Sequence, residues 1–194
     1  DLAKLKDISK NIIAKLSAEE VYQCVLAWAE SFSKDFYLLL KGSKKKAIDT
    51  FSIDRYVKNP RKDISKWEEV EGLFDYIFKD YNSLILDSEL LEKYEMQLIE
   101  SVMVDYAAAF DEKMEKAQWF ERGKELAKKY NFCLDNKIYL ATPHLFNGKL
   151  ADFFAIVRVV LTGRNNTPDL YSVCKVLGKD EITKRANNFK KLLK

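Results

Sequence analysis

The chain has few of the residues that usually form tight turns, disulfides and metal sites. Its 194 residues include 6 Gly, 3 Pro, 3 Cys and 1 His. Such low Gly and Pro contents argue against a β protein with many turns. Cys24, Cys133 and Cys174 are odd in number, lie far apart and form no Cys-x-x-Cys pair, which disfavours a disulfide framework or a zinc site and fits a reducing cytosol. We therefore expect a cytoplasmic protein without a bound metal.

Membrane spans and targeting signals are missing as well. The longest apolar runs are much shorter than the roughly 20 residues that cross a bilayer, and the N-terminus shows no signal-peptide pattern. We therefore expect no association with a membrane. Hydrophobic residues still make up 47% of the chain, enough for the core of one large domain or two small ones. Because the chain begins at Asp1 and not at Met, we expect it to be part of a longer protein.

No catalytic constellation can be recognised. His144 follows Pro143 in a predicted loop and has no Cys or Ser in a recognisable arrangement, so a structural or surface role is favoured. The stretch Gly163–Asn166 lacks the further glycines and the Lys-Ser/Thr pair of a phosphate-binding loop. The acidic residues are spread over helix faces with Lys partners, which is typical of a solvated surface. We expect no catalytic residue in this chain.

Helical periodicity dominates the sequence. Ser17–Glu20 has the form of a capping box, and apolar residues follow at helical spacing as far as Leu39, with Gly42 as the stop. Ser65–Glu68 has the same form and predicts a helix to about Phe78. Further helices are predicted from Ser88 through Tyr106, from Glu115 to Lys129 and from Pro168 to Gly178. Two more are predicted to end at Gly163 and at Leu193.

These patterns predict an all-α fold of two stacked helical bundles. A turn near residues 80–83 is the best candidate for a boundary, which gives a first subdomain of residues 1–82 and a second of residues 83–194. The segment Asn131–Gly148 is predicted to be irregular. No strand is predicted anywhere, and the sequence contains no internal repeat.

A candidate binding surface lies near the C-terminus. Arg158 is about 100° away from Val157 on a helical wheel, so we expect it to leave the buried stripe formed by Phe153, Val157 and Val160. Its planar guanidinium can hydrogen-bond the edge of a base or stack upon one. The alternative is an Arg whose stem covers Phe154 while the charged group stays in water.

The segment after Gly163 adds donors to this surface. Arg164 begins a polar loop, Thr167 is a predicted N-cap and Pro168 is predicted to occupy the first helical position. The amides at such a helix start can bind an anion or a base edge. The alternative is an ordinary helix cap.

Basic residues form a second candidate surface. The net charge of +3 is mild, so only local clusters can indicate an anionic partner. Arg55, Lys58, Arg61 and Lys62 surround a Pro turn with Tyr56 among them, which suits a flipped-out base and its phosphates as well as it suits a solvated loop. The remaining basic residues are predicted to supply only non-specific charge: Lys44–Lys46, Lys184, Arg185, Lys190 and Lys191.

The order of several motifs is specific. Arg158–Gly163 is followed by Thr167–Leu170 and then by Leu177–Lys179, and the N-terminal part contains Leu2–Lys6 and Leu16–Glu20. In this order the segments resemble the closing signature and the earlier helical segments of bacterial-type glutamyl-tRNA synthetases. The resemblance covers most of the chain, closely at the C-terminus and loosely in the middle. The chain departs from the family where Ile156-Val157 replaces a common Pro-Leu and where Asp169 replaces a common Gly.

The resemblance implies an all-helical anticodon-binding region that recognises tRNA-Glu. It implies that Arg158 reads the first anticodon base and that Thr167, Pro168 and Leu170 hold the middle uridine. It also implies that Arg55 or Arg61 contacts the third base, which decides whether tRNA-Gln is accepted too.

The ATP-binding motifs of that family are absent from this chain. The resemblance therefore implies that this chain binds no cofactor and that the full-length enzyme uses glutamate, ATP and Mg. We expect the full-length enzyme to be a monomer. The alternative function is a helical protein–protein interaction module without catalysis, which rests on the near-neutral charge, the helical stripes and the missing catalytic groups.

Overall fold

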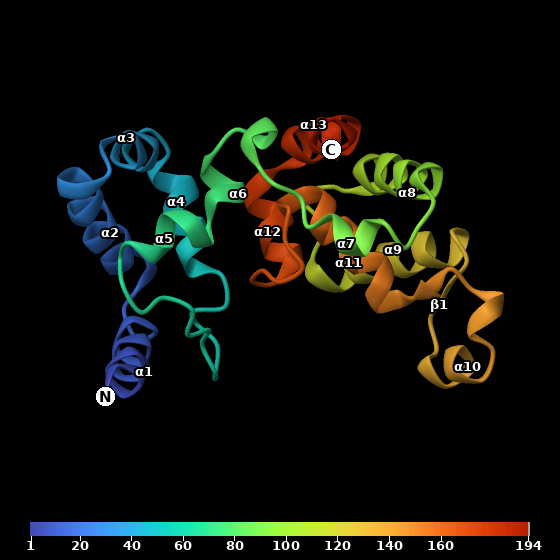
Figure 1. Cartoon of the computed structure of the whole chain (residues 1–194), viewed down its shortest axis with the longest axis horizontal. Coiled ribbons are helices and arrows are strands. Elements are labelled where there is room, and N and C mark those ends of the chain that lie inside the picture. The colour runs from blue at the N-terminus through green and yellow to red at the C-terminus, as the bar shows by residue number, and fades with distance from the viewer. Residues whose placement is uncertain (194) are drawn as a thin grey trace. The chain divides into compact units, whose positions relative to one another are not determined.

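A computed structural model describes residues 1–193, apart from the side chain of Ser88. The chain forms two compact units, Asp1–Lys79 and Asp80–Lys194 (Figure 1). Both units are built almost entirely from helices, so the predicted all-α class is confirmed. Over the described residues, no helix is both long enough and apolar enough to cross a membrane.

The first unit is a bundle of short helices around an aromatic core. Phe36 packs edge-on against Phe78 at 5.7 Å, and Phe51 packs in the same way against Phe74 at 5.8 Å. The predicted capping box at Ser17 is confirmed. The Glu20 amide donates to the Ser17 hydroxyl, and the Ser17 amide donates to the Glu20 carboxylate. The helices of this unit are α1 (Leu2–Ile13), α2 (Ala18–Phe32), α3 (Lys34–Gly42), α4 (Lys44–Ser52), α5 (Glu69–Leu73) and α6 (Asp75–Phe78).

Two predicted helices of this unit are interrupted. The helix expected to run to Gly42 breaks at Ser33, which leaves the helical conformation (φ −148°, ψ 82°) and donates its hydroxyl to Glu71. The helix expected from Ser65 begins only at Glu69, because the amide and hydroxyl of Ser65 donate to the Glu69 carboxylate and not to Glu68. This helix then breaks at Phe74 (φ −123°).

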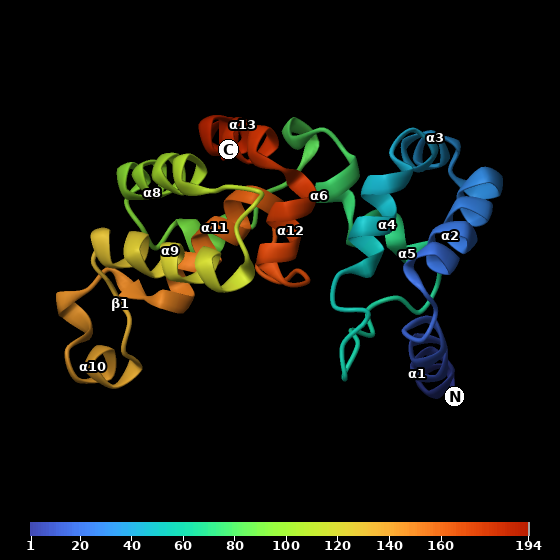
Figure 2. The same cartoon turned by 180° about the vertical axis from the view of Figure 1, so that it is seen from behind.

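The second unit is wrapped around a single buried helix. Figures 1 and 2 show α11 in the middle of this unit, in contact with α8, α9 and α13. The elements of the unit are η1 (Tyr81–Ser83), α7 (Ser88–Leu91), α8 (Met96–Ala109), α9 (Lys116–Lys129), β1 (Phe132–Cys133), α10 (Asn136–Ala141), η2 (Pro143–Leu145), β2 (Gly148–Lys149), α11 (Leu150–Thr162), α12 (Leu170–Leu177), α13 (Lys179–Asn188) and η3 (Phe189–Leu192).

The predicted stripe on α11 is confirmed. Phe153, Val157 and Val160 are fully buried. Both helices end at the predicted glycines. Gly163 ends α11 with φ +76°, and Gly178 ends α12 with φ +80°. An added Cβ at Gly163 would lie 2.6 Å from the Ile85 carbonyl oxygen, so this position requires glycine for space as well as for conformation.

Other predictions for this unit need correction. The long helix expected from Ser88 is two helices, because α7 ends at Leu91 and the extended Glu95 starts α8. The helix expected to reach Leu193 changes to a 3-10 turn after Asn188. No strand was predicted, yet Phe132–Cys133 pairs in parallel with Gly148–Lys149. Pairs of only two residues carry too little alternation to be visible in a sequence.

The start of the second unit is fixed by Tyr81. Its side chain is buried, and its hydroxyl donates to the carbonyl oxygen of Val160 at 2.5 Å. Residues 80–82 therefore pack with the second unit, which begins at Asp80.

Candidate functional site

Arg158 holds the turn that follows α11. It is half-buried between Val157 and Val159, which are both fully buried. One terminal nitrogen of its guanidinium, Nη1, donates to the carbonyl oxygens of Pro168 at 3.1 Å and Thr167 at 3.3 Å, and to the Thr167 hydroxyl. Arg158 therefore leaves the buried stripe as predicted, and it is directed to the turn at residues 167–168.

The start of α12 differs from the prediction. The N-cap is Asp169 and the first helical residue is Leu170, so Thr167 is not the cap and Pro168 is not the first helical position. The Asp169 carboxylate accepts hydrogen bonds from the amide and hydroxyl of Ser172, at 3.1 and 2.8 Å. The Thr167 hydroxyl is used elsewhere, because it accepts from Arg158 and donates to the Pro168 carbonyl oxygen.

Three of the predicted site residues are buried. Thr167 is 5% exposed, Leu170 is 4% exposed, and Pro168 is buried with them. What this turn offers to a ligand is therefore set mainly by the shape of its backbone. The Arg158 guanidinium fixes that shape through three hydrogen bonds to two consecutive residues.

Asp169 links the turn to α9. Its carboxylate accepts a hydrogen bond of 2.7 Å from Lys116 Nζ, in the first turn of α9. Burial alone would raise the pKa of Asp169, but the hydrogen bonds from Lys116 and Ser172 outweigh it, so the pKa of this carboxyl lies below its ordinary value.

The loop between α11 and α12 is also held at its start. The Thr162 hydroxyl donates to the Arg158 carbonyl oxygen at 2.7 Å and accepts from the Arg164 amide at 3.2 Å. The Asp87 amide donates to the Gly163 carbonyl oxygen at 2.9 Å, and the Asp87 carboxylate accepts from the Asn165 side chain. The segment 162–169 is therefore anchored at both ends.

Aromatic side chains line the side of α11 that carries Arg158. Phe154, one helical turn before Arg158, stacks parallel to Phe120 with ring centroids 5.7 Å apart and 9° between the planes. Trp119 contacts Phe154 at 5.1 Å and Tyr171 at 5.6 Å. This row joins α9, α11 and α12.

Below this row, Cys174 and Tyr106 lie fully inside the unit. Trp119 Nε1 donates to the Tyr106 hydroxyl at 2.9 Å, and that hydroxyl lies 3.2 Å from Cys174 Sγ. Cys174 is a core residue, and burial raises the pKa of its thiol to about 12, so it is not a thiolate nucleophile. Cys133 is also buried, in β1, and Cys24 is half-buried.

Arg55 and Arg61 belong to the first unit. The Arg55 guanidinium donates to the carbonyl oxygens of Phe51, Ile13 and Leu16 at 2.6 to 2.9 Å, so it holds the end of α1 against the end of α4. Burial lowers the pKa of Arg55. Arg61 forms an ion pair with Asp63.

Arg185 was expected to supply only non-specific charge, which is wrong. It is 1% exposed, its Nε donates to Glu181 at 2.8 Å, and its Nη1 donates to the Leu161 carbonyl oxygen at 2.6 Å. Its guanidinium also lies over the Tyr81 ring at 5.0 Å. The spacing of Arg185 from Ile182 and Phe189 places all three on one helix flank, which is a signal that the sequence offers.

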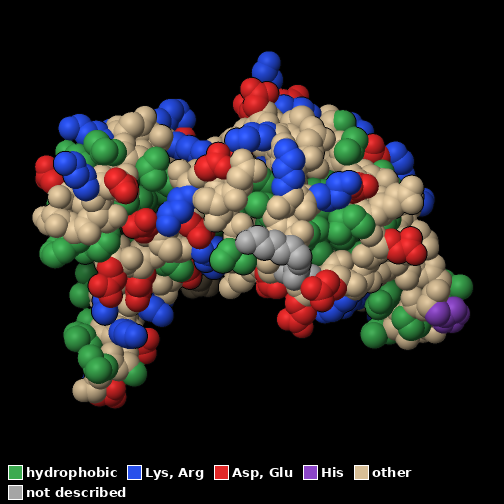
Figure 3. Space-filling model, turned by 45° about the horizontal axis from the view of Figure 1, so that its top comes forward, with side chains coloured by type: hydrophobic (Ala, Val, Ile, Leu, Met, Phe, Trp, Pro, Cys, Tyr) green, Lys and Arg blue, Asp and Glu red, His purple; other side chains and the backbone are tan. Residues whose placement is uncertain are grey.

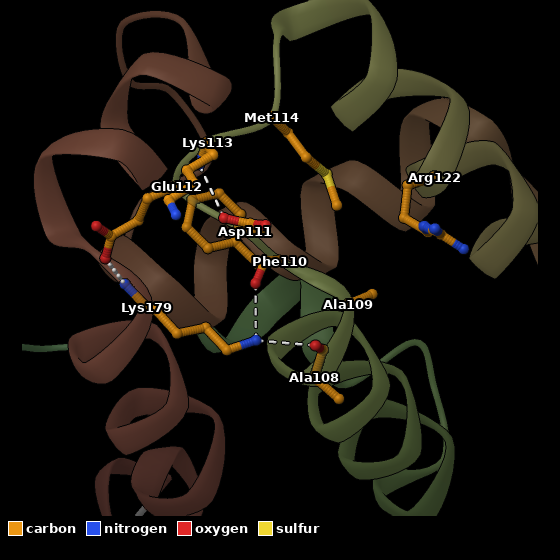
Figure 4. Close-up of a pocket in the computed structure, with 9 residues that line it drawn as sticks. All are labelled: Ala108, Ala109, Phe110, Asp111, Glu112, Lys113, Met114, Arg122 and Lys179. Atoms are coloured by element: carbon orange, nitrogen blue, oxygen red, sulfur yellow. Dashed lines mark hydrogen bonds between the residues drawn. The ribbon is translucent and has the colours of Figure 1, made fainter.

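One surface pocket lies at the C-terminal end of α8. It measures about 780 Å³, and Figure 4 shows the Lys179 side chain extended across it. Lys179 Nζ donates to the carbonyl oxygens of Ala108 at 2.8 Å and Phe110 at 2.7 Å, so it caps the C-terminus of α8. The Lys179 amide donates to the Glu112 carboxylate at 2.7 Å. Arg122, also at the pocket, points away from Lys179 in Figure 4.

The surface shows no large region of a single charge in the view of Figure 3, where basic and acidic side chains alternate. The single histidine, His144, is exposed on η2, in line with the predicted surface role. Over the described residues, no group of three or more His, Cys, Asp or Glu side chains could hold a metal ion.

Residues 20–190 match the family described as "Anticodon binding domain", and the chain belongs to this family. Its curated relatives include the glutamate–tRNA ligase of Clostridium perfringens strain SM101, which is 33% identical over 97% of this chain and 35% of its own length. The glutamate–tRNA ligase of Acetivibrio thermocellus is 29% identical over 95% of this chain and 34% of its own length. The chain thus spans about a third of these relatives.

Proposed function

We propose that this chain is the anticodon-binding region of a glutamate–tRNA ligase and that its partner is tRNA-Glu. The observation that carries the proposal is the anchored turn at Arg158 and Thr167, which lies in a domain of an anticodon-binding family. The relatives support the choice of amino acid through their names. The full-length enzyme is proposed to act as a monomer in the cytosol, where it joins glutamate to the tRNA with ATP and Mg.

Arg158 and the turn it holds are proposed to act as one unit in base recognition. Arg158 is assigned to the first anticodon base, with Arg164 as a neighbouring donor. Thr167, Pro168 and Leu170 are assigned to the middle uridine, and their burial supports recognition through a fixed backbone surface. Arg55 or Arg61 is assigned to the third base, which would set the tolerance for tRNA-Gln.

A titration tests the proposal directly. An anticodon stem-loop of tRNA-Glu with a fluorescent label is titrated with the chain at two salt concentrations, beside stem-loops with one changed anticodon base. Affinity that depends on the base and falls with salt is expected. Absence of binding near micromolar concentrations would favour the protein–protein interaction module instead.

Substitutions of Arg158 test the assigned site. Arg158→Ala removes the guanidinium and its bonds to the turn, so discrimination among first-base variants should fall by about 1–3 kcal/mol. Arg158→Lys keeps the charge without the planar fork and should lose most of the discrimination as well. Equal discrimination by parent and variants would show that Arg158 does not read this base.

A further inference from the structure

Phe120 lies on the outer side of the aromatic row and is 40% exposed. Its ring stacks parallel on Phe154, so its position is fixed by a second aromatic ring. Gly123 makes this contact possible, because a Cβ added there would lie 2.4 Å from the tip of the Phe154 ring. A ring held in one orientation at the surface loses little conformational entropy when a planar group stacks on it.

Two lysines flank Phe120 along α9. Lys116, Phe120 and Lys124 occur at intervals of four residues, which places them on one helix face with a rise of about 6 Å between neighbours. Lys124 Nζ lies over the Phe120 ring, 5.2 Å from its centroid, and donates a hydrogen bond of 2.6 Å to the exposed carboxylate of Glu121. Lys116 is the residue that bonds Asp169 at the start of α12.

The same contacts connect Phe120 to the turn at Arg158. Lys116, one helical turn before Phe120, touches the N-cap of α12, and Phe154, beneath the Phe120 ring, is one turn before Arg158. Phe120 is therefore connected to the proposed base-recognition site by two short routes, through Phe154 to Arg158 and through Lys116 to Asp169.

We propose that Phe120 is a stacking platform for one unpaired nucleotide of the anticodon loop, and that Lys124 binds its phosphate. This inference rests on the proposed function. A base that covers the ring displaces the Lys124 ammonium, whose flexible stem lets it move to the phosphate of the same nucleotide. Stacking of this kind accepts any base, so the platform adds affinity and positions the loop, while Arg158 and its turn supply the discrimination.

The test uses stem-loops in which 2-aminopurine replaces one loop base at a time. Stacking on the ring should quench the fluorescence of 2-aminopurine at one or two loop positions when the chain binds. Phe120→Leu keeps an apolar side chain on Phe154 but offers no aromatic face, so this quenching should disappear. Phe120→Trp should retain it.

Affinity gives the second readout. Phe120→Ala should weaken stem-loop binding about 5- to 150-fold at constant salt. Lys124→Gln should reduce the slope of log affinity against log salt by about 0.7. Leu140→Ala, which removes a side chain of α10 that is 79% exposed, and Arg122→Ala, on the other flank of α9, are the matched controls and should bind as the parent does. Circular dichroism and melting temperature verify that each variant is folded.

The outcomes separate the two proposals. If the parent binds with base and salt dependence while folded Phe120→Leu shows the same affinity and the same quenching, the platform is refuted and the proposed function stands. If the parent does not bind the stem-loop, both proposals fail. Loss of quenching at the same positions in Phe120→Leu, with recovery in Phe120→Trp, supports the platform.

Discussion

At the scale of single residues, Arg185 connects three parts of the second unit. It donates to Glu181 on its own helix and to the Leu161 carbonyl oxygen near the end of α11. Its guanidinium also lies over the ring of Tyr81. Arg185→Met should lower the free energy of unfolding by about 2–4 kcal/mol, because it leaves the Leu161 carbonyl oxygen and the Glu181 carboxylate without this partner. Urea denaturation followed by circular dichroism measures the change.

The neighbouring Lys184 is the matched control. Its contacts with Asp80 and Glu181 are long, at 3.8 and 3.9 Å, and its side chain is 47% exposed. Lys184→Met should therefore change stability by no more than about 0.5 kcal/mol. A similar loss of unfolding free energy in both variants would mean that the buried contacts of Arg185 do not stabilise the second unit.

Residue-level predictions from the sequence succeeded where a local pattern decides and failed where a distant partner decides. Gly163 as a helix stop and Val157 as a core residue follow from local spacing, and both are confirmed. Thr167 was a reasonable cap by its residue type, but Arg158 holds its hydroxyl. Asp169 is the N-cap of α12 and also accepts a hydrogen bond from Lys116, which is 53 residues away.

At the scale of elements, Gly163 controls the exit from α11. Gly163→Ala should destabilise the second unit by about 2 kcal/mol or more, because the residue has φ +76° and the new Cβ would collide with the Ile85 carbonyl oxygen. Gly42→Ala is the control, since an added Cβ there meets nothing within 4 Å and the residue lies in a helix. That variant should be unchanged or slightly more stable. Thermal unfolding of both variants decides the matter.

The start of α12 should respond to acid. The pKa of Asp169 is lowered in the folded chain, so its carboxylate contributes stability above its ordinary pKa of 3.8, and this contribution is lost as the pH falls through the lowered folded value. Asp169→Asn keeps a capping side chain without the charge. Its melting temperature should therefore fall less steeply than that of the parent between neutral pH and about pH 3.

Lys116→Met tests the cause of this acid response. If the Lys116 hydrogen bond lowers the Asp169 pKa, this variant should also show a shallower pH dependence, and the double variant should add little. Parallel curves for the parent and Asp169→Asn would contradict the assignment.

The positions of most helices could be predicted, but several of their ends could not. Apolar residues continue at helical spacing across the break at Ser33, with Val25 and Ala29 buried before it and Phe36 and Leu40 buried after it, so the spacing gives no sign of the break. The break itself depends on contacts such as the Ser33 hydroxyl to Glu71, which join segments distant in sequence.

At the scale of the whole molecule, the sequence pattern predicts a helical class and two subdomains. The proposed recognition site rests on the resemblance to a family. The pattern alone left Arg158 as one polar residue among many, because its partners at residues 167–168 come from a loop whose conformation is not periodic. No local pattern points to Phe120, since its partner Phe154 lies on another helix.

The division at Asp80 makes a prediction about independent folding. A fragment of residues 80–194 contains Tyr81, whose hydroxyl bonds Val160 and whose ring lies under Arg185. This fragment should therefore unfold in one cooperative transition. A fragment of residues 83–194 lacks both contacts and should melt about 5 °C or more lower. Tyr81→Phe in the longer fragment keeps the ring and loses only the hydroxyl, so its melting temperature should lie between the two. Equal melting temperatures for all three would show that Tyr81 does not hold the start of this unit, whereas a longer fragment without cooperative unfolding would show that the unit depends on residues 1–79.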